Sequence, residues 1–156
     1  MKKCLLVLML IVGSLGAQAK TMTCSGIQGG VIIDDLNQLV TVTGHRAIEV
    51  AELLLEGKNV YVDKITMAID QSKIQENRPG GIAKIEAMLT PNSAATVFYI
   101  NGDKEIVSLN GGFLSASFNP YYDIGMSGSL TVLKDGMYSR VSLYIPHLEC
   151  IREFNN

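Results

Sequence analysis

The clearest pattern along the chain is an alternation of apolar and polar residues, which is typical of half-buried β-strands. Between residues 121 and 133 the even positions are apolar or glycine, whereas Ser127, Ser129 and Thr131 fall on the opposite face. The next residues, 134–136, read Lys-Asp-Gly and predict a tight hairpin, because glycine adopts the positive φ that such turns need. A return strand follows over 140–145. At Pro146-His147 the alternation slips by one residue, which predicts a bulge or a strand break.

Most of the remaining chain consists of short apolar runs separated by glycine, proline, asparagine and aspartate. Asn101-Gly102 is a strong hairpin signal between two such runs. No internal repeat or linker divides the chain after residue 19. We therefore predict a mainly β protein with one domain over 20–156, either a single antiparallel β-sandwich or a small β-barrel. Its further expected strands are 21–27, 31–34, 38–43, 60–69, 82–89, 97–100, 106–109 and 113–118.

The segment 45–56 has a different period. Its polar residues His45, Glu49, Glu52 and Glu56 recur at spacings of four, three and four, and so form one stripe on a helix. Apolar residues lie opposite, and a glycine follows where a helix would end. The end of the segment also reads as a hairpin. We predict one short helix near 45–56.

Residues 1–19 have the three parts of a secretory signal peptide. Two lysines precede an apolar run over 5–12, and Ala17-Gln18-Ala19 fits the small-x-small site of a signal peptidase. The run is shorter than the roughly 20 residues that span a bilayer, although an uncleaved anchor is the alternative. We expect cleavage after Ala19, with the periplasm as the first destination and full secretion as the second.

Removal of this segment changes the charge and the cysteine count. The formal charge of −2 becomes −4 when Lys2 and Lys3 leave, and no basic cluster remains to attract nucleic acid or an anionic membrane surface. Three cysteines become two, Cys24 and Cys150. Since paired cysteines in exported domains usually form disulfides, we predict a bridge that ties the two ends of the domain together. Two buried thiols are the alternative.

The residues offer little support for catalysis. Only two histidines are present, neither beside a nucleophile motif, and no glycine-rich phosphate loop is apparent, so we expect no catalytic residues, cofactor or metal. The stripe of His45, Glu49 and Glu52 could supply metal ligands, but it is interpreted as the solvated face of the helix. The residues 34–37 lack the spacing of a calcium loop and are interpreted as a turn between two strands.

Two polar intervals are the candidate contact surfaces. The interval 70–81 is the longest polar stretch and is expected to be a loop; 119–122 places aromatic residues at a turn, where tyrosine often serves recognition. The candidate contact residues are Lys73, Gln75, Glu76, Asn77, Arg78, Asn119, Tyr121 and Tyr122.

These observations favour an exported, disulfide-clamped β-domain that binds a protein, a peptide or a small apolar ligand without catalysis. We expect no nucleic-acid partner and no integral membrane insertion. Two alternatives stay open. The first is a small outer-membrane β-barrel, which the long alternating hairpin suits but the 6% aromatic content and the segment 45–56 do not. The second is a metal-dependent enzyme that uses His45, Glu49 and Glu52.

Overall fold

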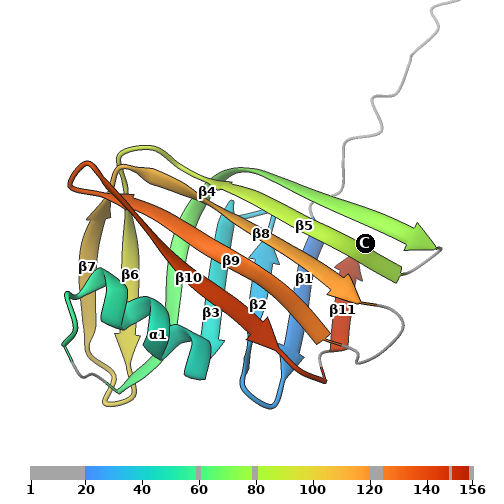
Figure 1. Cartoon of the computed structure of the whole chain (residues 1–156), viewed down its shortest axis with the longest axis horizontal. Helices are drawn as coiled ribbons and strands as arrows, with labels where there is room; N and C mark the ends of the chain where they lie inside the picture. The colour runs from blue at the N-terminus through green and yellow to red at the C-terminus, as the bar shows by residue number, and fades with distance from the viewer. Residues whose placement is uncertain (1–19, 59–60, 79–80, 120–124, 148, 155–156) are drawn as a thin grey trace, which may run out of the picture.

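A computed structural model describes residues 20–58, 61–78, 81–119, 125–147 and 149–154. Its strands form one antiparallel sheet that folds over into two layers, with a single helix in the described part of the chain (Figure 1). The mainly β prediction is confirmed. The elements are β1 (Lys20–Gly26), β2 (Gly29–Asp34), β3 (Leu39–Gly44), α1 (His45–Leu54), β4 (Val62–Arg78), β5 (Gly81–Leu89), β6 (Ser93–Tyr99), β7 (Lys104–Leu109), β8 (Gly111–Asn119), β9 (Gly125–Lys134), β10 (Met137–Ile145) and β11 (Glu149–Phe154).

The long strand β4 connects the two layers. Its first half pairs with β3 on one side and β6 on the other, whereas its second half pairs with β5. The back layer therefore runs β7-β6-β4-β3-β2-β1-β11, and the front layer runs β4-β5-β8-β9-β10. The pairing shifts register between Ile69 and Gln71, where β4 passes from one layer to the other. Such irregularities bend a strand and increase its twist.

The core lies between the two layers. Alternate residues of facing strands point inward, for example Val40 and Val42 on β3 and Ile65 and Met67 on β4, all at most 1% exposed. The front layer contributes the matching residues of β5, β8, β9 and β10. Burial of these apolar side chains is the main favourable contribution to folding, at about 25 cal/mol for each Å² removed from water.

The predicted helix is confirmed as α1. Ala47, Val50, Ala51 and Leu54 are fully buried, so its apolar stripe faces the core. The helix packs against β4, β3 and β2 and also against β10, alongside which it runs in Figure 1. Strand β10 is the last strand of the front layer and carries one charged residue, Arg140. A helix beside such an edge discourages pairing with other chains. No helix in the described segments is long and apolar enough to span a membrane.

The predicted disulfide is confirmed. Cys24 on β1 and Cys150 on β11 are direct cross-strand partners with a Cα–Cα distance of 4.0 Å. They close a loop with a sequence separation of 126. The bridge therefore joins the first and last strands of the domain. Disulfides of this kind persist in oxidising compartments and are rare in reducing ones.

The tight turns agree with the sequence. Asp135 and Gly136 both have positive φ, as a two-residue hairpin between β9 and β10 requires. In the turn after β2, the backbone and side-chain amides of Asn37 donate hydrogen bonds to the Asp34 carboxylate at 3.0 and 2.7 Å, which confirms the turn interpretation of 34–37. The predicted break near residue 146 is also confirmed, because β10 ends at Ile145 and His147 has a φ of 50°.

The prediction of a loop over 70–81 was wrong. Strand β4 continues to Arg78, and β5 begins at Gly81. In this half of β4, Ile74 packs partly against the core, whereas Lys73 and Gln75 are exposed on the other face. The described part of the chain gives this half of β4 a ladder partner on one side only, β5. Edge strands tolerate polar and charged residues, and these mask the alternation from which a strand is predicted.

Candidate functional site

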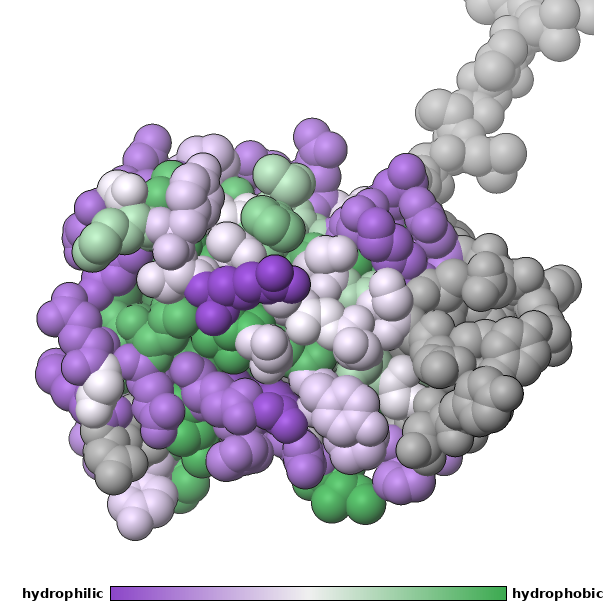
Figure 2. Space-filling view, in the orientation of Figure 1, coloured by the Kyte–Doolittle hydropathy of each residue, from purple (hydrophilic) through white to green (hydrophobic). Residues whose placement is uncertain are grey.

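The outer face of the front layer gathers polar and aromatic side chains in three rows that cross the strands. The cross-strand register aligns Gln71-Met88-Phe113-Thr131-Arg140, Lys73-Glu86-Ser115-Ser129-Ser142 and Gln75-Lys84-Ser117-Ser127-Tyr144. Five serines thus occupy the middle of the face, with larger side chains around them. Figure 2 shows this face, on which residues of intermediate hydropathy (white) lie among hydrophilic (purple) and hydrophobic (green) residues.

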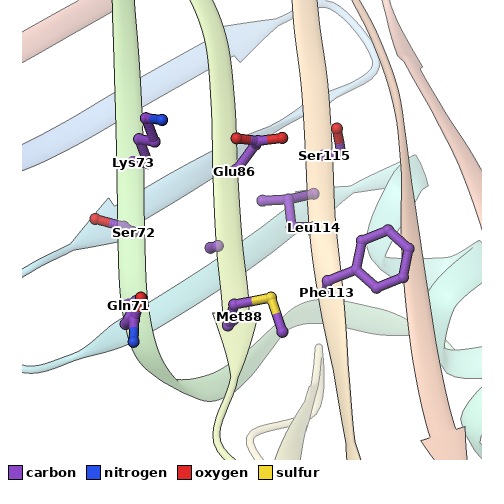
Figure 3. A pocket seen from close by; sticks show the side chains of 9 residues that line it. Gln71, Ser72, Lys73, Glu86, Met88, Phe113, Leu114 and Ser115 are labelled. Atoms are coloured by element: carbon purple, nitrogen blue, oxygen red, sulfur yellow. The ribbon is translucent and has the colours of Figure 1, made fainter.

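A hollow of about 340 Å³ opens on this face over β4, β5 and β8. Its two ends differ in character. Lys73 and Glu86 lie at one end, and Met88 and Phe113 lie at the other (Figure 3). Met88 is 54% exposed and Phe113 is 41% exposed, and the two are direct cross-strand partners, so that their apolar side chains lie next to each other. The hollow therefore combines an apolar end and a charged end.

The charges at this hollow are not balanced. The Lys84 ammonium donates a hydrogen bond to the Glu86 carboxylate at 2.5 Å, and this bond, with the nearby positive charges, lowers the pKa of Glu86. Lys73 lies opposite Glu86 in the register and its positive charge also acts on that carboxylate, but it forms no direct ion pair within the described residues. The charged residues of the three rows are Lys73, Lys84, Glu86 and Arg140. The face is thus positive, although the whole chain has a net charge of −2.

The structure separates the candidate contact residues of the sequence into three groups. Lys73 lines the hollow and Gln75 lies on the same face, one row further along β4. Glu76, Asn77 and Arg78 belong to β4 and Asn119 ends β8, but the positions of their side chains are not described. Tyr121 and Tyr122 lie outside the described residues. A contact role for all of these residues stays a prediction.

Sequence reasoning missed Glu86, Met88, Phe113 and Ser115. Each sits in an alternating strand, where an outward side chain is ordinarily exposed to solvent. The apolar character of Met88 and Phe113 at outward positions was the available signal. It could be read only with the register known, because a shift of one residue would place both side chains in the core.

The polar stripe of α1 does not assemble a metal site in the described chain. His45 Nε2 lies 3.7 Å from Glu49 Oε1, but both carboxylate oxygens of Glu49 accept hydrogen bonds from Arg46 at 2.7 Å. Glu52 is exposed to solvent. No group of three or more histidine, cysteine, aspartate or glutamate residues within the described segments is placed to hold a metal ion. This geometry supports the interpretation of the stripe as the solvated face of α1.

A second hollow, of about 310 Å³, lies between the end of α1 and β7. Lys134 donates to the Leu54 carbonyl at 3.0 Å and to Glu56 at 3.1 Å, so that a positive charge stands at the helix C-terminus. Beyond it, the Tyr99 hydroxyl donates a hydrogen bond to Glu105 at 2.6 Å. The polar groups around this second hollow are therefore already engaged in contacts within the protein. The hollow on the outer face of the front layer, with its exposed apolar side chains and a lysine that forms no direct ion pair within the described residues, is the better candidate for binding.

The Tyr99–Glu105 contact gives a pH dependence that can be measured. The hydrogen bond to Glu105 raises the pKa of Tyr99 to about 12, from 10.0. Because the folded-state pKa is raised, the contact stabilises the fold below pH 10 and this contribution is lost as the pH rises towards 12. In Glu105→Gln, we expect the phenol to titrate closer to 10, as followed by phenolate absorbance. A tyrosine titration identical to that of the wild-type protein would contradict the assignment.

Comparison with known proteins gives no match: no family model, no curated protein and no solved structure is significantly similar to this chain. The geometry and chemistry of the described residues are therefore the basis for assigning a function.

Proposed function

We propose that this protein is an exported, non-catalytic binding module that contacts a protein partner through the outer face of its front layer. The observation that carries the proposal is the hollow formed by Gln71, Lys73, Glu86, Met88 and Phe113, in which an apolar end adjoins a charged end whose lysine forms no direct ion pair within the described residues. Large apolar side chains exposed next to polar ones are typical of the anchoring points in protein interfaces.

The shape of the hollow favours a protein segment over a small ligand. Small-molecule sites usually enclose 70–90% of their ligand in a cleft of roughly 300–1,000 Å³. This hollow has a volume at the lower end of that range and lies on the open surface of a sheet. An anchoring side chain of a partner protein can fill such a space while the rest of the partner covers the surrounding serines.

Export is the second part of the proposal. The disulfide between Cys24 and Cys150 fits an oxidising compartment, and residues 1–19 have the pattern of a cleaved signal peptide. The periplasm is the compartment that we propose first. A disulfide that joins the terminal strands suits a small domain that works outside the reducing cytosol.

Export predicts a processed N-terminus. We expect mass spectrometry of the protein from an expressing Gram-negative cell to give a chain that begins at Lys20 and carries no free thiol before reduction. Osmotic shock should release it with the periplasmic fraction. Retention of residues 1–19, or thiols that react with an alkylating agent without reduction, would contradict this part of the proposal. A variant with Ala17→Lys and Ala19→Lys should stay unprocessed and serves as the control.

The binding proposal can be tested by selection of peptides from a random phage-displayed library on the immobilised, oxidised domain. We expect enrichment of a shared motif on the wild-type domain and its loss on Phe113→Ser and on Met88→Ser, since both changes remove the apolar end of the hollow. The matched control is Tyr138→Ser, which removes an aromatic side chain that is 72% exposed on β10, away from the hollow. It should leave the selection unchanged.

Two results would contradict the binding proposal. One is the absence of any enriched motif on the wild-type domain. The other is a motif that binds Phe113→Ser and Met88→Ser as well as the wild-type domain, because the contact would then lie elsewhere. Circular dichroism and thermal unfolding of each variant establish that a lost signal is not a lost fold.

A further inference from the structure

The geometry of the hollow points to one class of partner: an extended peptide segment that carries an acidic side chain and a large apolar side chain two residues apart. This inference rests on the proposed function and names the chemistry that the same hollow would recognise. The acidic side chain would meet Lys73, and the apolar side chain would contact Met88 and Phe113.

The spacing of the two ends sets the conformation of the segment. Glu86 and Met88 are two residues apart on β5, as are Phe113 and Ser115 on β8, so the charged row and the apolar row are roughly 7 Å apart. Residues i and i+2 of an extended peptide point to the same side and are separated by the same distance. On a helix the two side chains would have to be three or four residues apart, and their Cβ atoms would be about 5–6 Å apart, which is closer than the two rows.

The charge of the hollow sets the sign of the polar side chain. Glu86 is directly paired with Lys84 at 2.5 Å, so the two lysines and one glutamate of the charged end carry a net positive charge, and the Lys73 ammonium forms no direct ion pair within the described residues. Arg140, in the same row as Phe113, adds a second positive charge to the face. A basic segment would meet the positive charges of Lys73 and Arg140, whereas an acidic one would meet an opposite charge. Charge complementarity therefore selects the acidic segment.

The experiment compares three acetylated and amidated peptides of equal length. The first contains Ser-Glu-Ser-Phe-Ser, the second replaces Glu by Lys, and the third replaces Phe by Ser. Binding is followed by amide chemical shifts of the isotope-labelled, oxidised domain. We expect saturable shifts around Lys73, Met88 and Phe113 with the first peptide, and binding at least about tenfold weaker with each of the others. The binding of the first peptide should also weaken as the salt concentration rises.

Variants of the domain connect the effect to the named residues. Lys73→Gln should bring the first and second peptides to similar affinity, while Gln75→Ala, one row further along the same strand, should preserve the difference. Phe113→Ser should bring the first and third peptides to similar affinity. The exposure of all three positions makes loss of the fold an improbable explanation, and thermal unfolding checks it.

Five outcomes would overturn the inference. Equal affinity for the acidic and basic peptides would remove the role of Lys73, and shifts confined to another surface would remove the hollow. Octanoate that binds as tightly as the first peptide would show that a small amphiphilic carboxylate, and not an extended segment, is the ligand. If the phage selection yields a basic motif whose binding depends on Met88 and Phe113, this inference is refuted and the binding proposal stands. If no selected motif depends on Met88 and Phe113, both this inference and the binding proposal are refuted.

Discussion

Removal of the Cys24–Cys150 bridge is expected to lower the free energy of unfolding by about 5 kcal/mol. The bridge closes a loop with a sequence separation of 126, and the chain-entropy model gives a contribution of about this size for a loop of that length. The bond joins β1 to β11, which forms ladder hydrogen bonds with β1 alone in the described chain. Without the bond, β11 has only that one ladder to hold it. Urea denaturation of Cys24→Ala/Cys150→Ala measures the effect directly.

The control for this experiment is the wild-type protein in the presence of a reductant. It should unfold at the same denaturant concentration as the double variant, because the two proteins then differ only in two thiols. A loss of less than about 1 kcal/mol would mean that the unfolded chain is hardly constrained by the bridge, against the entropy model. Hydrogen exchange adds a spatial test, since the amides of β11 should lose protection before those of β4.

The second large effect is expected at Gly128, where even one methyl group has no space. A Cβ at this position would lie 2.6 Å from the Ala116 Cα, and it would approach the Ser115 carbonyl oxygen still more closely. Both neighbours belong to the adjacent strand β8, and Gly128 is the cross-strand partner of Ala116. We expect Gly128→Ala to cost about 2–4 kcal/mol, because the neighbouring backbone must move to accommodate the methyl group.

Gly102→Ala provides the matched control. Gly102 lies in the turn between β6 and β7, and nothing surrounds the added Cβ within 4 Å, although its φ of 92° is strained for alanine. Its cost should stay near 1 kcal/mol, which is the usual penalty for a residue in a disfavoured backbone region. The denaturation midpoints of the two variants measure the cost of steric overlap at Gly128 against the cost of backbone strain at Gly102. Equal costs would mean that β8 and β9 can separate easily, and would contradict the close packing of these strands.

The strands that could be predicted were those with one dry and one wet face. The alternation over 121–133 predicted β9, and Met126, Leu130 and Val132 are at most 1% exposed as that pattern requires. On the opposite face, which the pattern placed in solvent, Ser129 and Thr131 are also buried, at 5% and 8% exposure. The 3.6-residue period over 45–56 gave α1 in the same way. Residues 121–124 lie outside the described segments, so the start of that strand is not tested.

The second half of β4 could not be predicted, because its polar residues mask the alternation by which a strand is identified. Its polar residues are tolerated since it pairs with β5 on one side only in the described structure. A single apolar residue, Ile74, faces the core there, and one residue gives no periodic signal. The hollow could not be predicted either, because its lining residues come from three strands and the sequence of one strand does not give its register with the others.

The amino-acid sequence by itself determined the local features: strand alternation, the helix period, the tight turns and the pair of cysteines available for a bridge. Each of these depends on residues close together in the chain, or on a simple count. Only the tertiary structure decided that β4 crosses between the layers and that Lys73, Glu86, Met88 and Phe113 share one surface. It did so because cross-strand register places residues from different strands side by side, and register is set by the packing of the whole core.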